Sequence, residues 1–202
     1  IPVISYAFLG GKCSSCKAAI SIRYPIIELA TGILSVVAIA YFGVCWNGLA
    51  ALLLTWSLIA LTMIDLDTYL LPDDITLPLL WLGLIINSFG MFTDLPSALW
   101  GAVAGYMSLW MVYQLFKLVT GKEGMGYGDF KLFAAFGAWF GWQALIPIIL
   151  MASVIGAVVG IAIKFMGQLR EGGYVPFGPF LAIAGLTAMI FGPSAILASI
   201  GL

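Results

Sequence analysis

Two aspartates are the residues best placed to do chemistry in this 202-residue chain. Asp65 ends a long apolar run, and Asp129 follows a glycine-rich stretch at residues 124–128. A carboxylate beside membrane hydrocarbon is costly unless it has a partner or a function. An aspartic hydrolase needs one protonated and one ionised carboxyl to activate a water molecule and donate a proton. We therefore predict that Asp65 and Asp129 form a catalytic pair.

The expected helix ends suggest different roles for the two carboxyls. Asp65 is expected at a helix C-terminus, where the helix dipole disfavours an anion, and Asp129 at a helix N-terminus, where the dipole favours one. We expect Asp65 to be the protonated partner and Asp129 the base. Gly126 and Gly128 let the backbone approach a neighbour closely, and we assign them, with Lys131, to the loop that supports Asp129.

The chain contains no histidine, which excludes most other hydrolase chemistries. Ser-His-Asp triads, Cys-His dyads and zinc sites built on histidine all require that side chain. What remains is carboxylate chemistry or a serine–lysine pair. Lys131 and several serines are present, but the sequence indicates no pairing between them.

Hydrophobic residues make up 63% of the chain and charged residues only 8%. Soluble domains carry about a quarter charged residues, so we predict an all-α, polytopic membrane helical bundle. About seven transmembrane segments are expected, at residues 24–43, 46–64, 75–91, 97–118, 129–140, 142–165 and 179–200. The short segment 129–140 is rich in small residues, which allow close helix packing. The last segment contains Gly192-Pro193, where we expect a break.

The basic residues set the expected topology. With alternating crossings, all eight fall on one side, which the positive-inside rule identifies as cytoplasmic: Lys12, Lys17, Arg23, Lys117, Lys122, Lys131, Lys164 and Arg170. Two crossings separate Asp65 from Asp129. An even number of crossings returns the chain to the same side, so both aspartates should lie at the cytoplasmic surface.

Three ordered motifs resemble a known family. They are the D-L-D-T-Y-L-L-P-D-D run from Asp65 to Asp74, the G-M-G-Y-G-D-F-K-L run at residues 124–132, and the C-x-x-C element at Cys13 and Cys16 followed by I-S-I-R-Y-P-I-I-E-L. Together they resemble the type IV prepilin peptidases, which are GxGD-type aspartic proteases of the bacterial inner membrane.

This resemblance implies a function, substrates and site residues. The substrates would be type IV prepilins and type II secretion pseudopilins, whose short basic leader is removed after a glycine on the cytoplasmic side. The family's catalytic aspartates fall on Asp65 and Asp129, and its loop glycines on Gly126 and Gly128. Proteolysis would need no cofactor. Many members also methylate the new N-terminus with S-adenosylmethionine.

The cysteines depart from the full family pattern. Typical members have two CxxC pairs suited to a tetrahedral zinc site, whereas Cys13 and Cys16 supply only half of one. The chain starts at Ile1 with no signal peptide, and we expect the missing half in an absent N-terminal segment. Residues 1–23 would then be the remnant of a cytoplasmic N-terminal domain, and residues 24–202 the peptidase domain. Methylation by these residues alone is not expected.

Two other classes of protein remain open from the residues. A polytopic transporter could use intramembrane acids as an ion path. A metal-dependent membrane enzyme could use Asp65, Asp67, Asp73 and Asp74 as oxygen ligands, although that reading leaves the glycine-rich loop unexplained. The expected partners are the lipid bilayer and prepilin substrates, with no nucleic acid, and the sequence indicates no particular oligomeric state.

Overall fold

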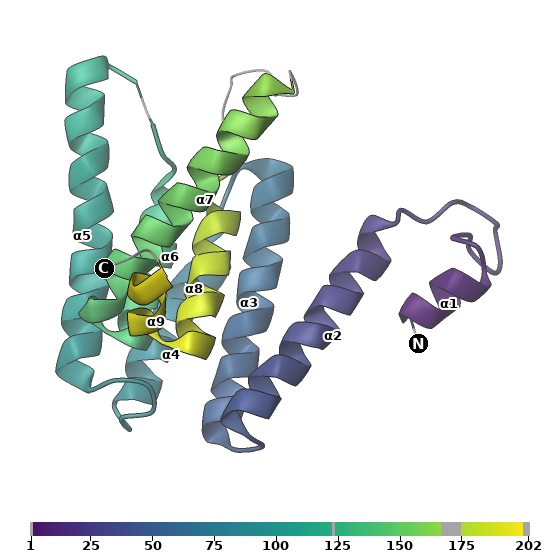
Figure 1. Ribbon diagram of the computed structural model, residues 1–202, viewed down its shortest axis with the longest axis horizontal. Helices are drawn as coiled ribbons and strands as arrows, with labels where there is room; N and C mark the ends of the chain where they lie inside the picture. Colours follow the sequence, from purple (N-terminus) through teal and green to yellow (C-terminus); the bar gives the residue numbers. More distant parts are fainter. Residues whose placement is uncertain (1, 123, 167–174, 200–202) are drawn as a thin grey trace. The chain divides into compact units, whose positions relative to one another are not determined.

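A computed structural model describes residues 2–122, 124–166 and 175–199. All elements in this part of the chain are helices: α1 (Pro2–Phe8), α2 (Arg23–Phe42), α3 (Trp46–Thr68), α4 (Asp73–Asn87), α5 (Leu95–Thr120), α6 (Tyr127–Phe140), the 3-10 turn η1 (Trp142–Ala144), α7 (Leu145–Phe165), α8 (Gly178–Phe191) and α9 (Pro193–Ser199) (Figure 1). The predicted all-α class is therefore confirmed.

The chain divides into two compact units, Ile1–Trp56 and Ser57–Leu202. The first unit holds α1, α2 and the start of α3. A short turn between α1 and α2 contains an isolated bridge from Lys12 to Ala19, and the Tyr6 hydroxyl donates to the Ile20 carbonyl at 3.2 Å. Within the same unit, the indole N–H of Trp56 donates to Ser35 Oγ at 2.9 Å, which ties α3 to α2.

Helix α6 is the core of the second unit. It packs against α5, α4 and α8, and ten of its residues are buried, including every predicted small residue. The backbones of α5 and α6 nearly touch, because a Cβ added to Gly137 would overlap the backbone of Gly101. The small residues of α6 therefore allow the close helix packing that the sequence predicts.

The seven predicted segments correspond to helices, but only some are long enough to cross a bilayer. Four helices meet the length and hydropathy of a span: α2, α3, α5 and the continuous stretch Trp142–Phe165. Helices α4, α6 and α8 have 15, 14 and 14 residues. The predicted last segment breaks at Gly192, which ends α8 with a φ of 82° before α9 begins at Pro193. This break is as expected.

In the second unit, Asp65 and Asp129 lie close to helix ends. Helices α3, α5 and α7 finish, and α4, α6 and α8 start, toward the upper end of Figure 1. Helix α3 continues to Thr68, three residues beyond Asp65, so the expected helix end at Asp65 was placed too early. Asp65 therefore belongs to the last turn of α3, and Asp129 to the first turn of α6.

Candidate active site

The start of α8 holds Asp65 in place. The Asp65 side chain is buried, with 5% of its surface exposed. The backbone N–H of Gly178, the first residue of α8, donates to Asp65 Oδ2 at 2.9 Å. Hydrogen bonds from a backbone N–H to a carboxylate are strong, and the positive end of a helix dipole adds to the attraction. Asp65 thus accepts a hydrogen bond from a backbone N–H that lies 113 residues away in the chain.

The glycine-rich loop at residues 124–128 places Asp129 next to residues 69–72, which connect α3 and α4. Gly126 precedes α6 as its N-cap, and Asp129 lies in the first turn with 8% of its surface exposed. A Cβ on Gly128 would lie 2.6 Å from Leu71 Cβ and 3.0 Å from the Leu71 carbonyl oxygen. Only glycine permits this approach without a shift of the backbone. The role of Gly128 is therefore close packing of the two segments that carry the acids.

Asp65 and Asp129 line the same cavity of about 330 Å³. Tyr69, the loop residues 124–126 and the segment 175–177 form its other walls. A second hollow of about 330 Å³ is also lined by both aspartates, together with residues that include Leu70, Leu71, Gly128, Asp73 and Lys131. The structure thus brings together the two carboxyls that the sequence analysis paired, at the junction of two hollows.

The surroundings of Asp129 act against the ionisation that the sequence predicts for it. Asp129 lies outside the four helices that are long enough to span a membrane. Burial, and then the charge of Asp65, raise the pKa of the Asp129 carboxyl to about 7, against a smaller lowering by the Gly126 backbone. Loss of hydration and a neighbouring carboxylate both disfavour the ionised form, so they act against the predicted role of Asp129 as the ionised partner, which stays a prediction.

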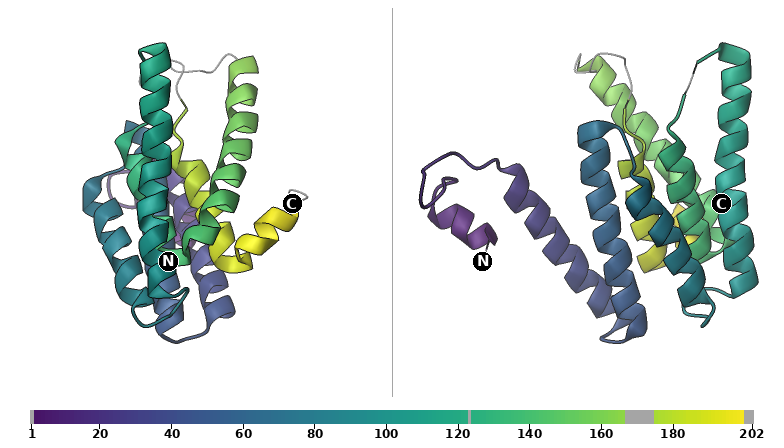
Figure 2. Two further views of the ribbon diagram at one scale, coloured as in Figure 1. Left: turned by 90° about the vertical axis from the view of Figure 1, so that its left-hand side faces the viewer. Right: turned by 180° about the vertical axis from the view of Figure 1, so that it is seen from behind.

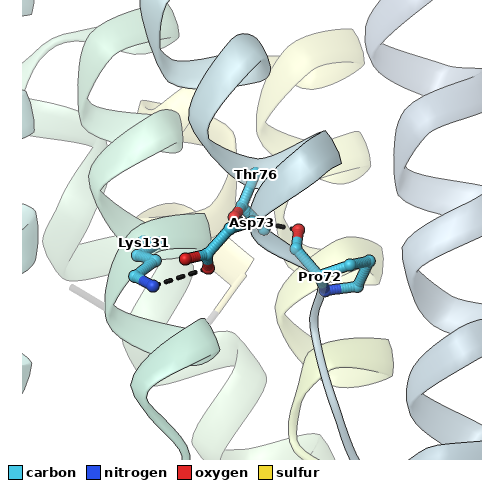
Figure 3. A network of polar contacts seen from close by, with 4 residues as sticks. All are labelled: Pro72, Asp73, Thr76 and Lys131. Carbon is cyan, nitrogen blue, oxygen red and sulfur yellow. Dashed lines mark hydrogen bonds and ion pairs between the residues drawn. The ribbon is translucent and has the colours of Figure 1, made fainter.

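Lys131 contacts α4 rather than the acids of the cavity. Its ammonium forms an ion pair with Asp73 in the first turn of α4, beside the Thr76 hydroxyl that donates to the Pro72 carbonyl at 3.2 Å (Figure 3). The Asp73 side chain is 54% exposed, so the pair contributes little stability. An ammonium held by a carboxylate is a poor general base, which disfavours the serine–lysine alternative.

The candidate metal ligands do not come together in the described residues. Within residues 2–122, 124–166 and 175–199, no group of three or more His, Cys, Asp or Glu side chains is arranged to hold a metal ion. Cys13 and Cys16 are free thiols in the first unit. Two thiolates alone do not complete a tetrahedral zinc site, so these residues do not fit a closed zinc centre by themselves.

Gly178 was not predicted as a site residue. The expected last segment begins at residue 179, one position after it, although the Gly178 N–H is the hydrogen-bond donor to Asp65. One signal was available: glycine followed by proline opens the last long apolar segment, and proline is favoured in the first turn of a helix. The pattern predicts a helix start at Gly178, but the sequence does not say which side chain that helix start faces.

Comparisons with family models and with individual proteins all match peptidases. Residues 52–161 match the family model described as "Type IV leader peptidase family", and residues 1–42 match "Bacterial Peptidase A24 N-terminal domain". A prepilin leader peptidase/N-methyltransferase of Stutzerimonas stutzeri is 61% identical over 95% of this chain and 66% of its own length. Proteins of the same name are 58% identical in Pseudomonas aeruginosa, with the same coverage, and 55% identical in Aeromonas salmonicida, over 96% of this chain and 67% of that protein. The chain thus spans about two thirds of the length of these relatives. No solved structure matches it.

Proposed function

Because the chain belongs to the type IV leader peptidase family, we propose that it is an aspartic endopeptidase that removes the leader peptides of type IV prepilins and pseudopilins. The observation that carries the proposal is the pair of buried carboxyls, Asp65 from α3 and Asp129 from α6, in the wall of one cavity. Two neighbouring carboxyls that share one proton are the catalytic unit of aspartic proteases.

The proposed reaction uses the two carboxyls in opposite protonation states. Asp65, which accepts the Gly178 N–H, is the base that takes a proton from a bound water molecule, and the resulting hydroxide adds to the scissile carbonyl carbon. Asp129, whose pKa is raised to about 7, donates its proton to the carbonyl oxygen. As the C–N bond breaks, Asp65 passes its proton to the leaving nitrogen, and Asp129 takes back a proton from one hydroxyl of the tetrahedral intermediate as the carbonyl of the new carboxylic acid forms. Because the two carboxyls titrate as a coupled pair, the assignment names one protonation microstate of that pair.

The proposal includes an orientation and a membrane. We place the cavity at the cytoplasmic face of the bacterial inner membrane, since Lys117 and Lys164 lie in the last turns of α5 and α7 and Lys131 lies near the start of α6. The aspartates lie at one end of their helices and are not spread along the depth of a span, an arrangement that favours hydrolysis at the surface over an ion path.

A second activity is proposed only for a longer chain. The relatives carry N-methyltransferase in their names, and methylation of the new N-terminus would use S-adenosylmethionine as methyl donor. We assign residues 1–23 to the N-terminal domain and residues 24–202 to the peptidase domain, although the match to the N-terminal domain model extends to residue 42. Cys13 and Cys16 would become zinc ligands only if further thiolates join them.

The test is cleavage of a purified prepilin by the protein in detergent, with and without a metal chelator. We expect leader removal that resists the chelator and is lost in both Asp65→Asn and Asp129→Asn, because each variant keeps the shape of the side chain and removes its proton chemistry. Asp67→Asn is the matched control, since Asp67 lies on the same helix but does not line either hollow. Chelator-sensitive cleavage that survives in Asp129→Asn would contradict the proposal.

A further inference from the structure

A third hollow adjoins the cavity that contains the aspartates. It has a volume of about 440 Å³ and lies between α5 and α7, with Phe180 of α8 among its lining residues. Its walls are apolar or small; they include Leu109 and Val112 from α5 and Ser153, Gly156 and Ala157 from α7. We call this hollow the α5–α7 groove.

The α5–α7 groove is continuous with the aspartate cavity. Met125, Val175 and Phe177 line both of them. Figures 1 and 2 show α5 and α7 diverging toward the ends at which they finish, which is the end where α6 and its Asp129 begin. A substrate chain that extends from the aspartates past Met125 and Phe177 would therefore enter an apolar groove between two long membrane helices.

The hollows around the aspartates differ in chemistry. One of them, which Gly128 also lines, contains the charged Asp73 and Lys131. The other continues into the α5–α7 groove, whose described lining residues carry no charge. Substrate segments should sort accordingly, because a charged group without a partner in an apolar groove would lose its hydration.

We propose that the α5–α7 groove binds an apolar helical segment of the substrate adjacent to the scissile bond, while the polar segment on the other side of that bond lies toward Asp73 and Lys131. This inference rests on the proposed peptidase function. A helix is the form in which an apolar segment satisfies its own backbone hydrogen bonds at membrane depth. Ser153 and Ala157 are small and exposed on the α7 side, so a helix can approach closely there.

Gly156 explains how the floor of the groove is built. A Cβ on Gly156 would lie 3.0 Å from Phe180 Cδ2, so the Phe180 ring of α8 packs directly on the α7 backbone. Because Phe180 lies two residues after Gly178, which holds Asp65, the same first turn of α8 contacts both the acid and the groove. A substrate helix against Phe180 would thus be positioned relative to the reacting carboxyls.

The experiment fills the groove and measures substrate recognition. Ala157→Trp places a large ring in the groove, whereas Val158→Trp adds the same ring to a neighbouring position that is 64% exposed and does not line it. We expect the KM for a prepilin with its apolar segment to rise about tenfold in Ala157→Trp, with a much smaller change in kcat, and to stay unchanged in Val158→Trp. Thermal unfolding in detergent checks that both variants fold.

A binding measurement that needs no turnover accompanies the kinetics. In the Asp65→Asn background, a photo-reactive phenylalanine derivative at position 157 should crosslink to the apolar segment of the prepilin, and the same derivative at position 158 should not. Equal crosslinking at the two positions, crosslinking at 157 only to lipid or to a second copy of the chain, or an unchanged KM in Ala157→Trp would overturn the inference.

The two proposals fail in distinguishable ways. If the wild-type protein does not cleave the prepilin at all, the peptidase proposal fails and the groove inference falls with it. If the wild type cleaves and the variants at Asp65 and Asp129 do not, while Ala157→Trp behaves like the wild type, the peptidase proposal stands and only the groove inference is wrong.

Discussion

Replacing Gly178 with alanine tests the geometry around Asp65 most directly. A Cβ at this position would lie 2.6 Å from Asp65 Oδ2, 3.1 Å from Asp65 Cγ and 3.1 Å from Leu71 Cδ2. The φ of Gly178 is outside the left-handed region, so alanine adds no backbone strain. The variant also keeps the N–H that Asp65 accepts. The only perturbation is therefore a methyl group pushed against the carboxyl.

The size of the effect follows from these distances. An ordinary contact of this kind begins at 3.4 Å, so the carboxyl or the start of α8 must move by about 0.8 Å. A displacement of about 1 Å in a catalytic group costs on the order of a hundredfold in rate, which corresponds to about 2.7 kcal/mol of transition-state free energy. We expect kcat for prepilin cleavage to fall by roughly that factor.

The assay is single-turnover leader cleavage in detergent, followed by gel mobility. Gly160→Ala is the matched control, since its Cβ would have only Val175 Cγ2 nearby, at an ordinary 3.9 Å. Combining Gly178→Ala with Asp65→Asn should add no further loss, because both changes act on one carboxyl. Activity of Gly178→Ala within about twofold of the wild type would refute the reasoning.

Two further predictions concern the charge of Asp129 and the packing of α6. Because the pKa of Asp129 is raised from 3.8 to about 7, the folded protein keeps a proton there that the unfolded chain loses at lower pH. The free energy of unfolding should therefore fall as the pH rises from about 4 to about 7, and then level off. Thermal unfolding at several pH values measures this, Asp129→Asn should remove that part of the slope, and an identical slope in the variant would contradict the assignment. Gly137→Ala should lower the melting temperature and the cleavage rate, because its Cβ overlaps the Gly101 backbone and overpacking costs about 1–3 kcal/mol. Gly160→Ala again serves as the control, and equal melting temperatures for the two variants would contradict the close α5–α6 packing.

The sequence was informative wherever a local pattern had a single physical meaning. The apolar runs identified the helices, and the Gly192-Pro193 pair identified the break between α8 and α9. Small residues at positions 134, 135, 137 and 138 identified α6 as a closely packed helix. Counting crossings brought Asp65 and Asp129 to the same side, and the structure places both in one cavity.

The protonation of the pair could not be predicted in the same way. In the sequence, the only visible influence on the Asp129 carboxyl is its expected position at a helix N-terminus, and that position favours an anion. The structure adds burial and the charge of Asp65, which act in the opposite direction and raise the pKa of Asp129. Both effects depend on helix packing, and Asp65 and Asp129 are 64 positions apart in the chain.

The sequence by itself determined the membrane character of this protein, its helices and the two aspartates proposed to act together, because composition, periodicity and motif spacing are local properties. Only the tertiary structure decided that the N–H of Gly178 holds Asp65, that Lys131 pairs with Asp73, and that an apolar groove continues from the aspartate cavity. The physical reason is that a hydrogen bond, an ion pair or a hollow depends on the distance between atoms, and that distance is set by helix packing between residues far apart in the chain.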